Sequence, residues 1–301
     1  MVTLETTFLD IFSAPDECNP PFPWLTQEKD ILKKVHDFRT MPDPEHHHWD
    51  LRVELTEVMK YIQKNAPAGT NLQEYTGQFV TTARTLSKIA TAVTRTDSNL
   101  HIFAAKQKDV IFIITAPGRE MNETESHSNR NKLCELIREN DHSNIDNKTK
   151  KCMSVLKAKM SNGAQAIDVF YGAEFDFMDK EYNFVDVQNI DVCRRKWLIE
   201  KSGDWFMRSE LGKISRSFYL TNGSSPGLKK IRTITKEKIA YKARNLWSKE
   251  RRCEGLFNFL RFLQDEMTMN NMTISYEFNT KKLKKMYGFA FVDEEFSDNY
   301  L

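Results

Sequence analysis

The chain has 301 residues, of which 40% are hydrophobic and 29% are charged, so it can bury a sizeable core and is not a disordered chain. Its formal net charge of +2 excludes a uniformly basic coat for nucleic acid but leaves room for a local basic cleft. The longest apolar runs, such as residues 110–115, are far shorter than a membrane span, so no membrane partner is expected.

The cysteines and the first residues predict the compartment. Five scattered cysteines, without a CxxC pair, argue against a disulfide framework or a zinc site. The start of the chain, MVTLETTFLDIF, has no basic residue before its apolar positions and does not resemble a secretory signal. We therefore expect an intracellular protein of the nucleus, the cytoplasm or both, which is not secreted.

The first third of the chain is predicted to be mainly helical after an irregular start. Residues 1–50 are rich in proline and acidic residues and indicate an extended N-terminal arm packed on the domain. Apolar residues at helical spacing predict a helix over 51–64. A second helix is predicted over 71–93, broken or kinked near Gly77.

The middle of the chain is predicted to alternate between strands and helices. Residues 100–105 and 110–115 are two apolar runs separated by KQKD, a pattern typical of a β-hairpin. A polar loop over 118–129 is expected to follow, and then two helices over 130–139 and about 148–160.

The last third is predicted to complete a mixed α/β domain. Its expected helices run from Trp205 to Ile214 and over 236–245 and 249–267, and its expected strands cover 216–221, 228–235 and 272–278. No internal repeat and no clean linker is found. We therefore predict an α/β (α+β) fold, with a single domain over 51–301 and a mixed β-sheet core flanked by helices.

An acidic pair of strands is the most informative feature of the sequence. One alternating segment carries Glu174 and Asp176, and the next carries Asp186 and Gln188. Residues i and i+2 of a strand point to the same face, so three carboxylates converge if the segments form a hairpin. Such a group requires a counter-charge, usually a divalent cation, although exposed strand faces also carry acidic residues. The pattern is typical of a metal-dependent site that cleaves phosphodiesters.

Over about residues 75–290 the chain resembles the DXO family of mRNA 5′-end decapping exoribonucleases. The similar segments are the helix TTARTLSKIATA with the hairpin after it, KKCMSVLKAKMSNGAQAIDVFYGAEFDF, and the strand pair in SELGKISRSFYLTNGSSPGLKKIRTIT. Gly172, Glu174 and Asp176 match the G-E-hydrophobic-D motif of the family.

The chain departs from the family at other motif positions. In the E-hydrophobic-K strand, Asp186 replaces a glutamate and Gln188 replaces the catalytic lysine. The G-Y-x-F-E motif falls at NKLCE, where only Glu135 is kept. A family arginine falls near Ala83 or Arg84. Arg216 stands where the family has a glutamine, and it could restore the missing positive charge.

The resemblance implies a function in RNA 5′-end processing, with a divalent cation as cofactor. The candidate catalytic residues are Glu174, Asp176, Asp186 and Gln188, the candidate substrate-binding residues are Arg84 and Arg216, and the candidate ligands of Mg²⁺ or Mn²⁺ are Glu135, Glu174, Asp176 and Asp186. The implied partner is an RNA 5′ end that is capped or carries a triphosphate or monophosphate.

Three hypotheses are open at this point. The first is a divergent metal-dependent hydrolase that removes caps, releases pyrophosphate or degrades RNA from the 5′ end. The second is a catalytically impaired pseudoenzyme that binds RNA 5′ ends or a protein partner, which the degraded motif and the near-neutral charge favour. The third is an unrelated α/β protein with an accidental acidic hairpin.

Overall fold

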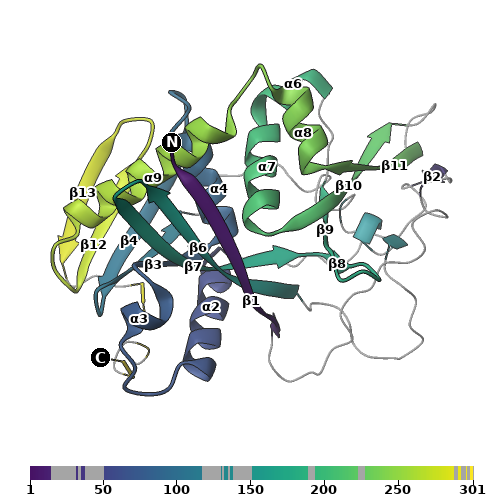
Figure 1. Cartoon of the computed structure of the whole chain (residues 1–301). Coiled ribbons are helices and arrows are strands. Elements are labelled where there is room, and N and C mark those ends of the chain that lie inside the picture. Colours follow the sequence, from purple (N-terminus) through teal and green to yellow (C-terminus); the bar gives the residue numbers. More distant parts are fainter. Residues whose placement is uncertain are drawn as a thin grey trace.

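Two β-sheets, with helices around them, form the framework of the protein (Figure 1). The computed structural model describes residues 1–14, 32, 35–37, 51–116, 130, 132–134, 136–137, 151–188, 194–222, 228–287, 291–292, 296 and 299–300. The predicted α/β class, with a mixed sheet core flanked by helices, is confirmed.

The larger sheet, sheet A, has eight strands in the order β1-β6-β7-β3-β5-β4-β12-β13. Their bounds are β1 Thr3–Ala14, β6 Lys151–Asn162, β7 Gln165–Phe175, β3 Phe79–Thr82, β5 Val110–Thr115, β4 His101–Gln107, β12 Met272–Glu277 and β13 Lys282–Tyr287. Strand β3 runs parallel to both of its neighbours and the other pairs are antiparallel, so the sheet is mixed.

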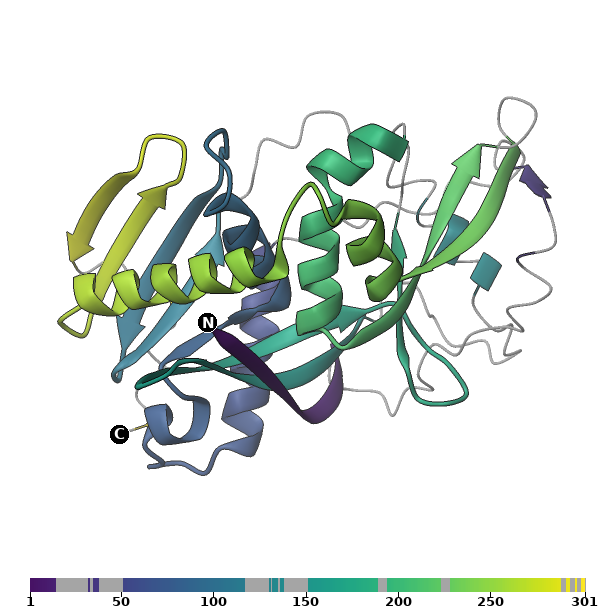
Figure 2. The ribbon, with the colours of Figure 1, turned by 45° about the horizontal axis from the view of Figure 1, so that its top comes forward.

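Both faces of sheet A are covered by helices, because alternate side chains of its strands point to opposite faces. On β5, Ile111 and Ile113 pack in one core and Phe112 in the other. The helices α4 (Ala83–Ala92), α7 (Ser202–Leu211) and α9 (Lys249–Glu266) cover the first face, and α2 (Leu51–Asn65) and α3 (Leu72–Thr76) cover the second (Figure 2).

The smaller sheet, sheet B, has five strands in the order β2-β11-β10-β9-β8. Their bounds are β2 Val35–Asp37, β11 Leu228–Thr235, β10 Ile214–Asn222, β9 Phe184–Gln188 and β8 Phe177–Met178. Strands β9 and β10 are parallel, and the other pairs are antiparallel. The short helices α6 (Arg194–Glu200) and α8 (Lys236–Ala243) complete the described elements.

The helix predicted over about 148–160 is wrong, because the described part of this segment lies in strand β6. The strand pairs with β1 on one side and β7 on the other, and the side chains from Cys152 to Leu156 are all buried. A strand buried on both faces loses the alternation by which strands are recognised, and its pairing overrides the helical propensity of alanine, lysine and methionine.

The helix predicted over 71–93 is broken at Gly77 as expected, but strand β3, which was not predicted, separates α3 from α4. Gly77 ends α3 with a φ of 88°, and a Cβ there would lie 2.7 Å from the Cβ of Asp168. The β-branched run from Val80 to Thr82 then favours an extended backbone.

The other predictions agree more closely with the structure. The hairpins expected over 100–115 and 216–235 are β4–β5 and β10–β11. The strand expected over 272–278 is β12, which pairs with the unpredicted β13. The arm expected over 1–50 supplies edge strands to both sheets, β1 and β2, and the loop expected over 118–129 lies outside the described residues. In the described part of the chain, no helix has the length and apolarity to cross a membrane.

Candidate functional site

Three acidic residues lie where the chain passes from sheet A to sheet B, and we call them the acidic junction: Glu174, Asp176 and Asp186. Glu174 is near the end of β7, Asp176 lies between β7 and β8, and Asp186 is in the middle of β9. The amide of Asp176 donates a hydrogen bond of 3.1 Å to the carbonyl of Val185. The predicted acidic hairpin therefore exists as β8–β9, but its first segment is divided between the two sheets.

Asp176 and Asp186 converge on one backbone amide. The amide of Val187 donates to Oδ2 of Asp176 at 2.7 Å and to Oδ1 of Asp186 at 2.9 Å. Asp186 is only 3% exposed, and burial raises its pKa to about 7, with Asp176 adding to the rise and Arg208 opposing it. A carboxyl group that titrates near neutral pH can donate or accept a proton in a reaction.

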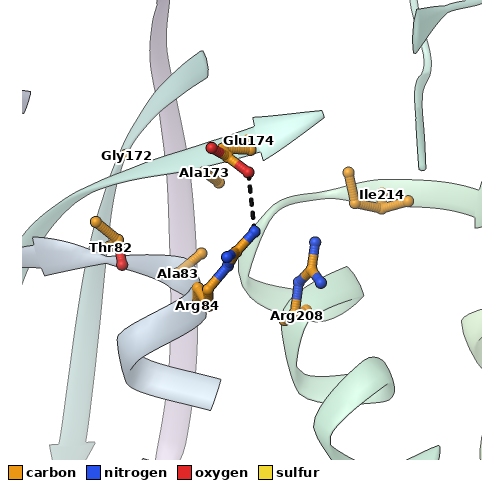
Figure 3. A pocket seen from close by; sticks show the side chains of 8 residues that line it. All are labelled: Thr82, Ala83, Arg84, Gly172, Ala173, Glu174, Arg208 and Ile214. Atoms are coloured by element: carbon orange, nitrogen blue, oxygen red, sulfur yellow. Dashed lines mark hydrogen bonds and ion pairs between the residues drawn. The ribbon is translucent and has the colours of Figure 1, made fainter. Parts of the chain in front are cut away.

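Arg84 and Arg208 reach the acidic junction from two helices. Arg84 lies in the first turn of α4, where the side chain of Thr82 caps the helix. Its Nη2 is 3.1 Å from Oε2 of Glu174 (Figure 3). Arg208 lies in the last turn of α7, and its Nη2 is 3.4 Å from Oδ2 of Asp186. Both arginines therefore place positive charge beside the junction.

A small pocket opens beside these groups. Figure 3 shows that Arg84, Glu174 and Arg208 line it, together with Ile214 and the backbone of Gly172. Gly172 is required here for packing, since a Cβ would lie 2.7 Å from Cγ2 of Val58. The pocket thus presents two guanidinium groups and one carboxylate.

Arg130 contacts the junction from a third direction. Its Nη2 is 2.5 Å from Oδ1 of Asp176, and its Nε donates to the carbonyl of Val187 at 3.1 Å. Attraction to Asp176, and to a lesser extent to Asp186 and Glu174, raises the pKa of Arg130, so the guanidinium stays charged at all relevant pH values. Its side chain is 31% exposed.

Gln188 uses its amide to hold Asp186. Its Nε2 donates a hydrogen bond to Oδ2 of Asp186, the same oxygen that faces Arg208. A carboxamide brings no charge, so the positive charge beside Asp186 comes from Arg208 on another element.

The structure brings together five of the predicted site residues and leaves one elsewhere. Glu174, Asp176, Asp186, Gln188 and Arg84 gather at the junction. Arg216, predicted to bind phosphate, points to the turn after β8 and contacts Asp179 there. Glu135, predicted as a metal ligand, lies outside the described residues.

Arg216 holds a turn of the chain. Its Nη1 is 2.6 Å from Oδ2 of Asp179, and the other oxygen of Asp179 accepts from the amides of Glu181 and Asn183. Although burial opposes it, the hydrogen bonds from Asn183 and Arg216 hold the pKa of Asp179 below its usual value. In this arrangement Arg216 stabilises the β8–β9 turn.

Sequence reasoning missed Arg130 and Arg208. Neither belongs to a motif, and they lie 46 and 22 residues from the carboxylates that they contact. The only signal was the charge itself, because three adjacent carboxylates require positive partners and arginine can supply them as well as a metal ion can.

The described side chains do not fit a divalent cation as they are arranged. Carboxylates are suitable ligands for Mg²⁺ or Mn²⁺. However, no group of three or more His, Cys, Asp or Glu residues among those the structure describes could hold a metal ion. Because guanidinium and amide donors occupy the junction carboxylates, the expected cation stays a prediction for this chain.

Comparison with known proteins gives the fold. No protein-family model and no curated protein sequence matches the chain. Solved structures do match: Scheffersomyces stipitis Rai1 with (3′-NADP)+ and calcium aligns at 10% identity and a TM-score of 0.66, covering 95% of this chain and 90% of that one.

Two further structures give the same result. Candida albicans Rai1 with pU5 and Mn²⁺ aligns at 10% identity and a TM-score of 0.64, covering 99% of this chain and 95% of that one. K. lactis Dxo1 with manganese aligns at 14% identity and a TM-score of 0.65, covering 96% and 91%. The resemblance to the DXO family is therefore confirmed at the level of the fold: the chain has the fold of Rai1 and Dxo1 over nearly its whole length.

Proposed function

We propose that this chain binds RNA 5′ ends through a DXO-type fold and that it is catalytically impaired. The observation that carries the proposal is that each carboxylate of the acidic junction is paired with an arginine. Positively charged guanidinium groups therefore stand where a divalent ion was predicted. The solved Rai1 structures support an RNA end as the ligand, since one of them contains pU5 and another contains (3′-NADP)+.

Arg84 and Arg208 are the residues that we expect to hold the terminal phosphate. Both line the pocket, and their side chains are 30% and 23% exposed, so they are accessible and still positioned by their carboxylate partners. A guanidinium group can donate two parallel hydrogen bonds to a phosphate. A 5′ monophosphate carries more negative charge than an internal phosphodiester. It should therefore bind these guanidinium donors with a more favourable free energy.

The test is a comparison of two RNAs of identical sequence, one with a 5′ monophosphate and one with a 5′ hydroxyl. Fluorescence anisotropy in the presence of a metal chelator should show a preference of about tenfold for the phosphorylated end. Arg84→Gln and Arg208→Gln should each remove the preference while leaving weak binding to the RNA chain.

The matched control is Arg95→Gln, which removes a guanidinium that pairs with Asp97 on the surface. It should keep the preference for the phosphorylated end. Equal affinity of the wild type for both RNAs would refute recognition of the 5′ phosphate, and no binding of either RNA would leave a protein partner as the ligand.

A metal-dependent hydrolase is the second candidate, and one observation favours it. Asp176 and Asp186 share the Val187 amide, and Asp186 titrates near neutral pH, as a reacting group would. Wild-type protein would be incubated with Mn²⁺ and with 5′-triphosphate, NAD-capped and 5′-monophosphate RNAs. Product that disappears in Asp176→Ala would establish the enzyme, whereas no product from any of the three favours binding alone.

A further inference from the structure

The oxygens of the acidic junction already have donors. Both oxygens of Asp176 accept a hydrogen bond, one from Arg130 and one from the amide of Val187. Both oxygens of Asp186 accept as well, one from the same amide and one from Gln188. Every oxygen of these two carboxylates thus already accepts a hydrogen bond from the protein itself.

Arg130 is the central member of this network. It contacts Asp176 through Nη2 and the carbonyl of Val187 through Nε, while the amide of Val187 binds both aspartates. The contacts close a ring that contains the Arg130 guanidinium, the backbone of Val187 and the Asp176 carboxylate. Arg84 and Arg208, in contrast, reach the junction from its pocket side.

A divalent ion would need the same oxygens. Such ions bind carboxylate oxygens at about 2.0–2.6 Å and require several of them at once. The Nη2 of Arg130 lies 2.5 Å from Oδ1 of Asp176 and points its proton at that oxygen. The guanidinium and an ion cannot both occupy this place, because their positive charges repel each other and their contacts overlap.

We infer that Arg130 is a built-in counter-cation, which takes the place of a divalent ion among the junction carboxylates and keeps the site metal-free. When the charge at position 130 is removed, the junction carboxylates lose their nearest counter-charge and can turn toward a divalent ion. This inference concerns cation binding alone and does not depend on RNA binding.

The test measures thermal unfolding during titration with Mn²⁺, Mg²⁺ and Ca²⁺. The wild type and Arg130→Lys, which keeps the charge, should show no shift of the melting temperature. Arg130→Gln, which keeps polarity but removes the charge, should be stabilised by about 5 °C when the ion exceeds its dissociation constant about 100-fold. The shift should disappear in the double variant Arg130→Gln, Asp176→Asn.

A second measurement does not depend on the stability of the variants. The electron paramagnetic resonance signal of free Mn²⁺ should be unchanged by wild-type protein and reduced by Arg130→Gln. Binding of Mn²⁺ by the wild type at the junction, lost in Asp176→Asn, would overturn the inference. An Arg130→Gln protein that folds only with Mn²⁺ supports it, and one that binds none of the three ions overturns it.

Discussion

Asp176 and Asp186 lie against one backbone amide, yet their charges are balanced differently. Asp176 has a guanidinium nitrogen of Arg130 at 2.5 Å, whereas the nearest nitrogen of Arg208 is 3.4 Å from Asp186. Burial therefore dominates at Asp186 and raises its pKa from 3.8 to about 7. The two carboxylates are neighbours in space but differ in how closely a positive charge approaches them.

Asp186→Asn should change stability in a pH-dependent way. A raised pKa means that the native state binds the Asp186 proton more tightly than the unfolded state does, so the stabilisation is complete below about pH 4 and is lost as the pH rises through about 7. The variant should match the wild type near pH 5 and be more stable by about 1–3 kcal/mol near pH 8, as measured by urea unfolding.

Asp176→Asn provides the contrast for this experiment. It leaves Arg130 without its charged partner and should destabilise the protein by about 1–3 kcal/mol at both pH values. An Asp186→Asn variant whose stability relative to the wild type is the same near pH 5 and pH 8 would contradict the assigned pKa.

At the scale of elements, helix α7 connects the site to the rest of the fold. It carries Arg208, and its neighbouring Glu210 accepts from Nζ of Lys236 at 2.8 Å and from Nζ of Lys249 at 2.6 Å. These lysines are the first residues of α8 and α9. The hydroxyl of Tyr171 also donates to the carbonyl of Leu211 at 2.9 Å, which ties the end of α7 to β7. One carboxylate thus links three helices.

Glu210→Gln should therefore weaken the fold at neutral pH. Burial opposes ionisation of Glu210, but the hydrogen bonds from Lys236 and Lys249 outweigh it and lower its pKa. The stabilisation is present above the unfolded pKa of about 4.5 and is lost as the pH falls through the native value. Urea unfolding near pH 7 should show a loss of about 1–3 kcal/mol that shrinks at acid pH.

The control for Glu210→Gln is Asp97→Asn, which breaks the surface pair of Asp97 with Arg95. Because exposed ion pairs contribute little, its effect at pH 7 should be the smaller of the two. If Glu210→Gln destabilises the protein no more than this surface variant does, Glu210 does not link the helices as described.

At the scale of the whole molecule, both sheets contribute to one of the hydrophobic cores. The core on the α4 face of sheet A includes Leu156 and Tyr171 from that sheet, Ile234 from β11 of sheet B, and Ile239 from α8. The acidic junction lies at the boundary between the sheets, between β7 of sheet A and β8 and β9 of sheet B. The single domain predicted over 51–301 stays a prediction, and unfolding can test it.

We expect the protein to unfold in one cooperative transition, because separating the sheets exposes their common core. Far-ultraviolet circular dichroism and tryptophan fluorescence should give the same midpoint in urea. Trp197 and Trp205 lie in the shared core, so their fluorescence reports on it. Two separated transitions would mean that the sheets are independent folding units.

Elements with a local signal could be predicted from the sequence. The helix α9 has its N-cap Ser248 and a regular apolar face, and the strands β4 and β5 flank a short polar turn. The strand β6 could not be predicted in this way, because sheet pairing decided its conformation against helical propensity. The strand β3 has a local signal in its β-branched residues, but it is only four residues long and lies between two helices.

The sequence by itself determined which acidic residues could meet, because Glu174, Asp176 and Asp186 stand at two-residue spacing or in the next strand-like segment of the chain. The strand period did not hold through Asp176, since β7 ends at Phe175 and β8 begins at Phe177. Only the tertiary structure decided which positive charges meet them. Arg84 lies 90 residues from Glu174 and Arg130 lies 46 residues from Asp176, and no local pattern connects residues so far apart. Local propensity acts over a few residues, whereas charge pairing depends on which elements pack together.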